Sequence, residues 1–120
     1  MSHYYSTKPD APSAPKQVEF RIHGQNFIFT TDSGVFSKSE IDFGSKLLIE
    51  TAIMDLKARG IKSGRLLDLG CGYGVVGIVM KRVYPAMQVV LGDVNQRALE
   101  LSKNNARDNF NQQQNLAAQG

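Results

Sequence analysis

A strand-like segment that runs directly into a glycine-rich turn is the feature that most constrains the fold of this chain. Residues 65–69 (Arg-Leu-Leu-Asp-Leu) predict a short strand, and glycines follow at positions 70, 72, 74 and 77. Glycine removes Cβ atoms at such a turn, so the backbone can bend sharply and contact a ligand. The apolar run after the turn, its length and the stop at Pro85 predict a buried helix.

A second strand and helix follow the first pair. Residues 89–91 predict a buried strand that ends at Gly92 and Asp93, and Asn95 is the predicted N-cap of the next helix. The order strand, glycine loop, helix, strand, helix predicts an α/β fold with a Rossmann-like parallel sheet.

Two further elements precede this unit. Residues 18–22 and 27–31 are rich in apolar and β-branched side chains around a turn at residues 23–25, which predicts a β-hairpin. Residues 42–59 change to helical periodicity. Their predicted apolar face consists of Leu48, Ile49, Ala52, Ile53 and Leu56.

The ends of the chain differ from its centre. Residues 1–16 contain Pro9, Pro12 and Pro15, which predicts a flexible arm. Residues 104–120 hold nine Asn or Gln among 17 positions, and we expect residues 111–120 to be a disordered tail. Residues 17–110 are then expected to form one ordered domain.

Composition limits the class of protein. The chain has 120 residues and no apolar run of membrane-spanning length, and its N-terminus lacks a secretory signal. Its single cysteine, Cys71, excludes a disulfide framework or a cysteine-based zinc site, so we expect a cytoplasmic protein with no metal and no membrane partner. A net charge of +3 permits an anionic partner such as RNA, although the basic residues are scattered.

The glycine loop suits two ligands, a dinucleotide or S-adenosylmethionine. Gly72, Gly74 and Gly77 match G-x-G-x-x-G, and Asp93 lies 21 residues after Gly72, near the spacing of a ribose-binding acid. One hypothesis is therefore an NAD(P)-binding oxidoreductase domain.

Asp68 separates the two hypotheses. Its carboxylate sits at the end of the first strand, where it would repel a pyrophosphate and attract the cationic ammonium and sulfonium of S-adenosylmethionine. Two like charges 4 Å apart cost about 4 kcal/mol at an effective dielectric constant near 20. We expect Asp93 to accept hydrogen bonds from the ribose hydroxyls. Cys71 is interpreted as a small loop residue rather than a nucleophile, because both histidines lie upstream of it.

These motifs resemble those of class I S-adenosylmethionine-dependent methyltransferases. Residues 67–74 (Leu-Asp-Leu-Gly-Cys-Gly-Tyr-Gly) are similar to their first motif, and residues 91–95 (Leu-Gly-Asp-Val-Asn) to their second. Residues 31–37 (Thr-Asp-Ser-Gly-Val-Phe-Ser) resemble the upstream segment of the small-domain group. That group includes bacterial ribosomal RNA guanine-N2 methyltransferases, and the resemblance covers residues 3 to 109.

The resemblance implies the cofactor and its contacts. It implies S-adenosyl-L-methionine as cofactor and ribosomal RNA or a ribosomal subunit as partner. The cofactor-binding residues implied are Asp68, Gly70, Cys71, Gly72, Gly74, Asp93 and Val94, with a further contact suggested for Asn95, and Phe36 and Ser37 closing over the cofactor.

One family motif is missing from these residues. The catalytic Asn-Pro-Pro-aromatic motif would fall beyond residue 135, and the prolines here stand only at positions 9, 12, 15 and 85. The resemblance implies that residues 17–110 are the N-terminal part of a methyltransferase domain, with only the first two central strands of its sheet. We therefore expect a cofactor-binding half that lacks catalytic residues, either a fragment or a chain with an altered end. The alternatives are the NAD(P)-binding domain and a non-catalytic module that binds cofactor or RNA.

Overall fold

The computed structural model describes residues 15–32, 43–110 and 116–119. In chain order its elements are β1 (Pro15–Ile22), β2 (Gln25–Asp32), α1 (Phe43–Ala58), β3 (Gly64–Leu69), α2 (Val75–Val83), β4 (Met87–Gly92), α3 (Gln96–Asn109) and β5 (Leu116–Gln119). Strands β1 and β2 form one sheet, and β3, β4 and β5 form a parallel sheet in that order. The predicted α/β class, with a hairpin before a parallel sheet, is confirmed.

The hairpin forms because both residues of its turn adopt the left-handed backbone conformation that a two-residue connection requires. His23 (φ 53°) and Gly24 (φ 73°) make the two-residue connection, and Ile22 then pairs with Gln25 in an antiparallel register. Alternate residues point inward, so that Val18, Phe20 and Ile22 are buried. Strand β1 begins at Pro15, which pairs with Asp32, so the ordered region starts two residues before the predicted boundary of the arm.

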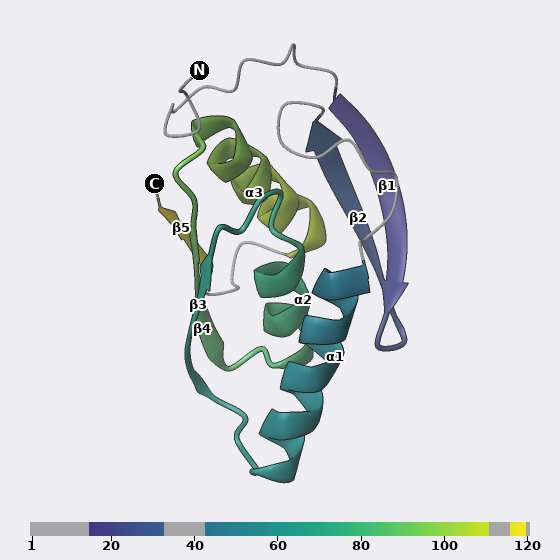
Figure 1. The fold of residues 1–120 in the computed structure, drawn as a ribbon, viewed down its shortest axis with the longest axis vertical. Helices are drawn as coiled ribbons and strands as arrows, with labels where there is room; N and C mark the ends of the chain where they lie inside the picture. The colour runs from purple at the N-terminus through teal and green to yellow at the C-terminus, as the bar shows by residue number, and fades with distance from the viewer. Residues whose placement is uncertain (1–14, 33–42, 111–115, 120) are drawn as a thin grey trace.

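Helices fill the space between the hairpin and the parallel sheet (Figure 1). The core there joins Phe29 of β2, Ile49 and Ile53 of α1 and Ile78 of α2. Leu48 was predicted on the apolar face of α1 but is 56% exposed, because the helix packs through a narrower stripe than its sequence suggests. Within the described residues, no helix is both long and apolar enough to cross a membrane.

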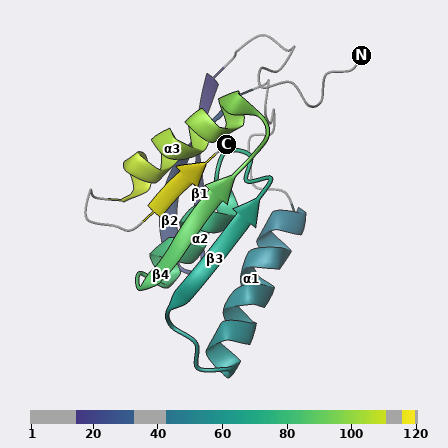
Figure 2. The ribbon, with the colours of Figure 1, turned by 90° about the vertical axis from the view of Figure 1, so that its left-hand side faces the viewer.

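The parallel sheet is covered on one face only. In β4, Met87, Val89 and Leu91 are buried against the helices. Leu67 and Leu69 of β3 point to the other face, which none of the described helices covers (Figure 2). The strand predicted as buried over residues 89–91 is buried at Val89 and Leu91, whereas Val90 is only partly buried, because α1, α2 and α3 all pack on the same side of the sheet.

Part of the predicted disordered tail forms a strand. Leu116–Gln119 pair in parallel with Val89–Gly92 of β4 as β5, so the expectation of disorder over residues 111–120 is wrong at these four positions. The remaining positions of that tail and residues 1–14 lie outside the described residues. The prediction weighed apolar side chains alone, whereas pairing with the edge of β4 supplies backbone hydrogen bonds that polar residues use equally well.

Candidate functional site

The glycine loop joins the carboxyl end of β3 to the start of α2. Gly70, Gly72 and Gly74 have φ angles of 68°, 57° and 98°, a left-handed backbone conformation that residues other than glycine rarely adopt. The Gly74 amide donates to the Cys71 carbonyl at 2.9 Å, and the Cys71 amide donates to the Gly92 carbonyl at 3.0 Å. One backbone hydrogen bond within the loop and one to the end of β4 therefore fix the position of the loop.

Asp68 lies under this loop, on its α1 side. Its carboxylate accepts a hydrogen bond from the Gly77 amide at 3.1 Å. Ser45 of α1 and Val75 of α2 line the same small hollow. Burial raises the pKa of the Asp68 carboxyl, the Gly77 amide opposes that shift, and the negative charge of Asp93 adds to it. The structure therefore places a partly desolvated anion beneath the loop.

Asp93 lies on the other side of the loop and connects it to α3. One carboxylate oxygen accepts from the Gly72 amide at 2.9 Å, and the other accepts from the Asn95 amide at 2.8 Å. A carboxylate offers about four lone-pair positions, so both oxygens can still accept a hydroxyl group. Asn95 caps α3 by accepting from the Ala98 amide at 3.1 Å, the role predicted for it as a helix cap.

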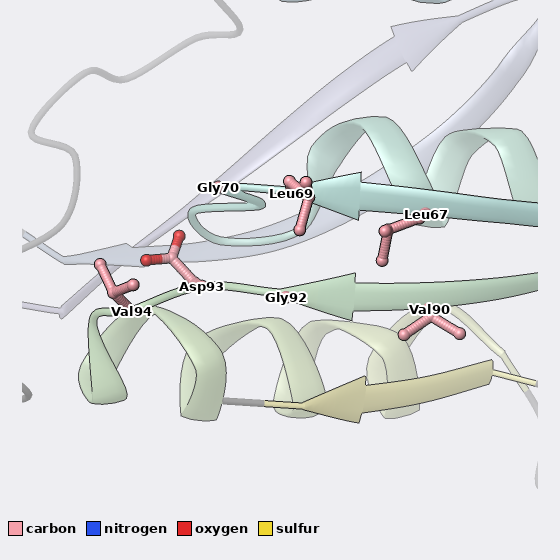
Figure 3. A pocket seen from close by; sticks show the side chains of 7 residues that line it. All are labelled: Leu67, Leu69, Gly70, Val90, Gly92, Asp93 and Val94. Carbon is pink, nitrogen blue, oxygen red and sulfur yellow. The ribbon is translucent and has the colours of Figure 1, made fainter.

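An apolar groove of about 400 Å³ begins beside Asp93. Figure 3 shows the Asp93 carboxylate between the glycine loop and the start of α3, with Val94 next to it. The groove continues along the uncovered sheet face, and its lining consists of Leu67, Leu69, Gly70, Val90, Gly92, Asp93 and Val94. A hydrogen-bond acceptor next to an apolar surface suits a sugar that carries a flat, largely apolar ring.

The two acids therefore stand at one end of the sheet but in separate hollows. Gly70 lines both the hollow of Asp68 and the groove of Asp93, so the loop itself is the divider. The arrangement suits a ligand that crosses bare main chain, with a cationic part near Asp68 and a hydroxylated part near Asp93.

Cys71 is part of the loop but is not suited to nucleophilic attack. Its side chain is buried, and burial raises the pKa of its thiol to about 11, so the thiol remains protonated at neutral pH. This agrees with its interpretation as a small loop residue. Phe36 and Ser37, which were expected to close over the cofactor, lie outside the described residues.

One residue that supports the site was missed from the sequence. Asn105 of α3 donates a hydrogen bond to the carbonyl of Tyr73, in the middle of the glycine loop, at 2.7 Å. Asn105 and Asn109 belong to the Asn/Gln-rich stretch of residues 104–120, yet they are four residues apart and therefore share one helix face.

The raised pKa of Asp68 predicts that its charge opposes folding. A raised folded pKa means that stability falls as pH rises from the unfolded pKa, near 3.9, through the higher folded value. Asp68→Asn removes that cost and keeps an oxygen for the Gly77 amide. We expect a higher urea midpoint than wild type at pH 7 and no advantage below about pH 3.9.

The matched control for this variant is Asp108→Asn, at an exposed position on α3. We expect it to change the free energy of unfolding by less than about 0.5 kcal/mol at either pH. A lower urea midpoint for Asp68→Asn at pH 7 would show that the folded environment favours the carboxylate, contrary to this argument.

A family model and individual relatives of this chain point to the same family. The model of the methyltransferase small domain family matches residues 26–119. The protein YbxB of Bacillus subtilis (strain 168), described as uncharacterized, is 44% identical over 107 residues, which are 89% of this chain and 51% of the relative. Ribosomal RNA small subunit methyltransferase C of Vibrio vulnificus (strain CMCP6) is 37% identical over 108 residues, which are 85% of this chain and 30% of the relative.

A solved structure agrees with these relatives. The 16S rRNA N2 G1207 methyltransferase (RsmC) of T. thermophilus, in complex with AdoMet and guanosine, matches with a TM-score of 0.76 and 27% identity. The match covers 92% of this chain and 29% of that one, so the chain spans between 29% and 51% of the length of these three proteins. From the family match over residues 26–119, the chain belongs to the methyltransferase small domain family.

Proposed function

We propose that this chain is the cofactor-binding half of an S-adenosylmethionine-dependent methyltransferase whose substrate is a guanine exocyclic amine of ribosomal RNA. The observation that carries the proposal is the pair of acids, Asp68 and Asp93, on either side of a glycine loop that begins a helix. The names of the relatives and the ligands of the solved neighbour support the cofactor and the RNA substrate.

The residues present fit the cofactor in charge and polarity. Asp68 would attract its ammonium group, since a partly desolvated carboxylate interacts strongly with a cation. Asp93 would accept from the ribose hydroxyls, and Val94 would pack against the adenine at the mouth of the apolar groove. Gly70, Gly72 and Gly74 leave the main chain between them free of side chains.

The same arrangement disfavours a dinucleotide. A dinucleotide places its pyrophosphate at the glycine loop and the helix N-terminus, which here would bring it beside two carboxylates. When bound, S-adenosylmethionine supplies an electrophilic methyl group on a cationic sulfur. The exocyclic amine of guanine is a weak nucleophile, so its orientation carries much of the catalysis. The Asn-Pro-Pro-aromatic motif expected to orient it does not occur in residues 1–120.

We therefore expect this chain to bind S-adenosylhomocysteine and not NADH. A ligand at 100 times its dissociation constant raises the free energy of unfolding by about 2.7 kcal/mol. Thermal-shift measurements should show a rise in Tm with S-adenosylhomocysteine or S-adenosylmethionine, and none with NADH at equal concentration. Isothermal titration then gives the dissociation constant.

Stabilisation by NADH alone would replace this proposal with the oxidoreductase hypothesis. Whether these residues contain the catalytic groups is tested separately, with tritiated S-adenosylmethionine and ribosomal subunits. We expect cofactor binding without incorporation of label by the 120-residue chain. Incorporation would show that these residues already contain the catalytic groups, and would exclude the non-catalytic module.

A further inference from the structure

Helix α3 is joined to strand β2 by two asparagine side chains that imitate a neighbouring strand. Asn105 accepts from the Thr30 amide at 2.7 Å and donates to the Thr30 carbonyl at 3.0 Å. Asn109 accepts from the Ile28 amide at 3.0 Å and donates to the Ile28 carbonyl at 2.7 Å. Each side-chain amide therefore pairs with one residue of β2 as a backbone amide would.

The match follows from the two backbone repeats. Four residues along a helix advance about 6 Å, and two residues along a strand advance about 6.6 Å. Asn105 and Asn109 thus meet Thr30 and Ile28 in register, on the edge of β2 that does not pair with β1. The backbone N–H and C=O groups of Thr30 and Ile28 are thus hydrogen-bonded within the fold, which removes the cost of burying them unpaired.

The two asparagines differ in where their second N–H group goes. In Asn109 it donates to the Asn105 carbonyl, within the same helix, at 2.8 Å. In Asn105 it donates to the Tyr73 carbonyl of the glycine loop at 2.7 Å. Asn105 is fully buried, and its amide uses its oxygen and both hydrogens. It therefore connects β2, α3 and the glycine loop at one point.

Tyr73 lies where the glycine loop needs support. Its neighbours, Gly72 and Gly74, both have positive φ, and glycine backbone has many accessible conformations. Asp93 holds the Gly72 amide from the groove side, while Asn105 holds the next carbonyl from the opposite, buried side. The Tyr73 ring also packs edge-on against Phe29 of β2, with centroids 5.7 Å apart.

We propose that Asn105 is a positioning residue that holds the glycine loop in its cofactor-binding conformation and couples it to the hairpin. This inference rests on the proposed function, because the ligand of the loop is taken to be S-adenosylmethionine. Asn105 itself lies behind the loop, so its effect on the cofactor passes through the Tyr73 peptide.

The chain offers a matched pair of variants, Asn105→Ala and Asn109→Ala. Each removes one two-bond pairing with β2, and only Asn105→Ala also releases the glycine loop. We expect both to lower Tm. At a temperature where both are folded, the dissociation constant of S-adenosylhomocysteine should rise at least tenfold for Asn105→Ala and less than twofold for Asn109→Ala.

Amide hydrogen exchange without ligand supplies a readout that a general loss of stability would not give. We expect faster exchange at the Cys71, Gly72 and Gly74 amides in Asn105→Ala, and wild-type exchange there in Asn109→Ala. If Asn105→Ala does not fold in buffer, all three proteins are compared in trimethylamine N-oxide, which favours the compact state.

Equal changes in the two variants, in either affinity or loop exchange, would overturn the inference and make Asn105 a structural residue only. If wild type fails to bind S-adenosylhomocysteine, the proposed function fails instead. The exchange comparison then still decides whether Asn105 holds the loop.

Discussion

Replacing Gly77 with valine is expected to lower the free energy of unfolding by about 3 kcal/mol, the upper end of the usual cost of overpacking. A Cβ at position 77 would lie 2.3 Å from Leu91 Cδ2, 3.1 Å from Val89 Cγ1 and 3.3 Å from Asp68 Oδ2. Leu91 and Val89 are both fully buried, so neither can move away cheaply. Helix α2 must therefore retreat from β4, which also lengthens the bond between Gly77 and Asp68.

Gly44→Val is the matched control, because Gly44 is an exposed residue in the first turn of α1. Both variants exchange glycine for valine within a helix, so they share the change in helix propensity, and the difference between them measures packing at position 77. Thermal denaturation should show a drop in Tm of about 10 °C or more for Gly77→Val and little change for the control. Similar Tm values for the two variants would contradict the close contact of α2 and β4.

Replacing Asp93 with alanine is expected to weaken S-adenosylhomocysteine binding by at least about 100-fold. Hydrogen bonds to a charged group contribute about 1.5–3 kcal/mol each, and Asp93 would offer two to the ribose. The variant also releases the Gly72 amide, which loosens the loop that the ligand crosses. Isothermal titration measures the change.

Asp108→Ala removes the same charge at an exposed position of α3 and should leave the dissociation constant within twofold. Comparing Asp93→Ala with Asp93→Asn separates the two roles of this residue. Asparagine keeps one oxygen for a backbone amide and lacks the charge, so its affinity should lie between those of wild type and Asp93→Ala. Wild-type affinity in Asp93→Ala would remove Asp93 from the site.

Local patterns were reliable where a short stretch of sequence decides the outcome. The hairpin turn at His23 and Gly24 was predictable because a tight connection requires positive φ. Asn95 was predictable as a helix cap because its side chain bonds to its own helix. Asp68 and Asp93 were predicted at one edge of the sheet because the carboxyl ends of parallel strands meet there.

Predictions failed where distant segments meet. Leu48 follows the helical period but is exposed, because the packing partners of α1 cover only part of its apolar face. Leu116–Gln119 have little apolar surface, yet they pair with β4 through their backbone. Asn105 had no visible role, because its partners, Thr30 and Tyr73, lie 75 and 32 residues away in the chain.

The sequence by itself determined the order of the elements from β1 to α3, the glycine turn and the two acids at strand ends, since these depend on backbone preferences and periodicity within a few residues. Only the tertiary structure decided that the acids occupy separate hollows divided by Gly70, that one sheet face is left uncovered by the described helices, and that an asparagine on α3 holds the loop. The physical reason is that burial and hydrogen-bond pairing depend on neighbours in space, which no local pattern of residues specifies.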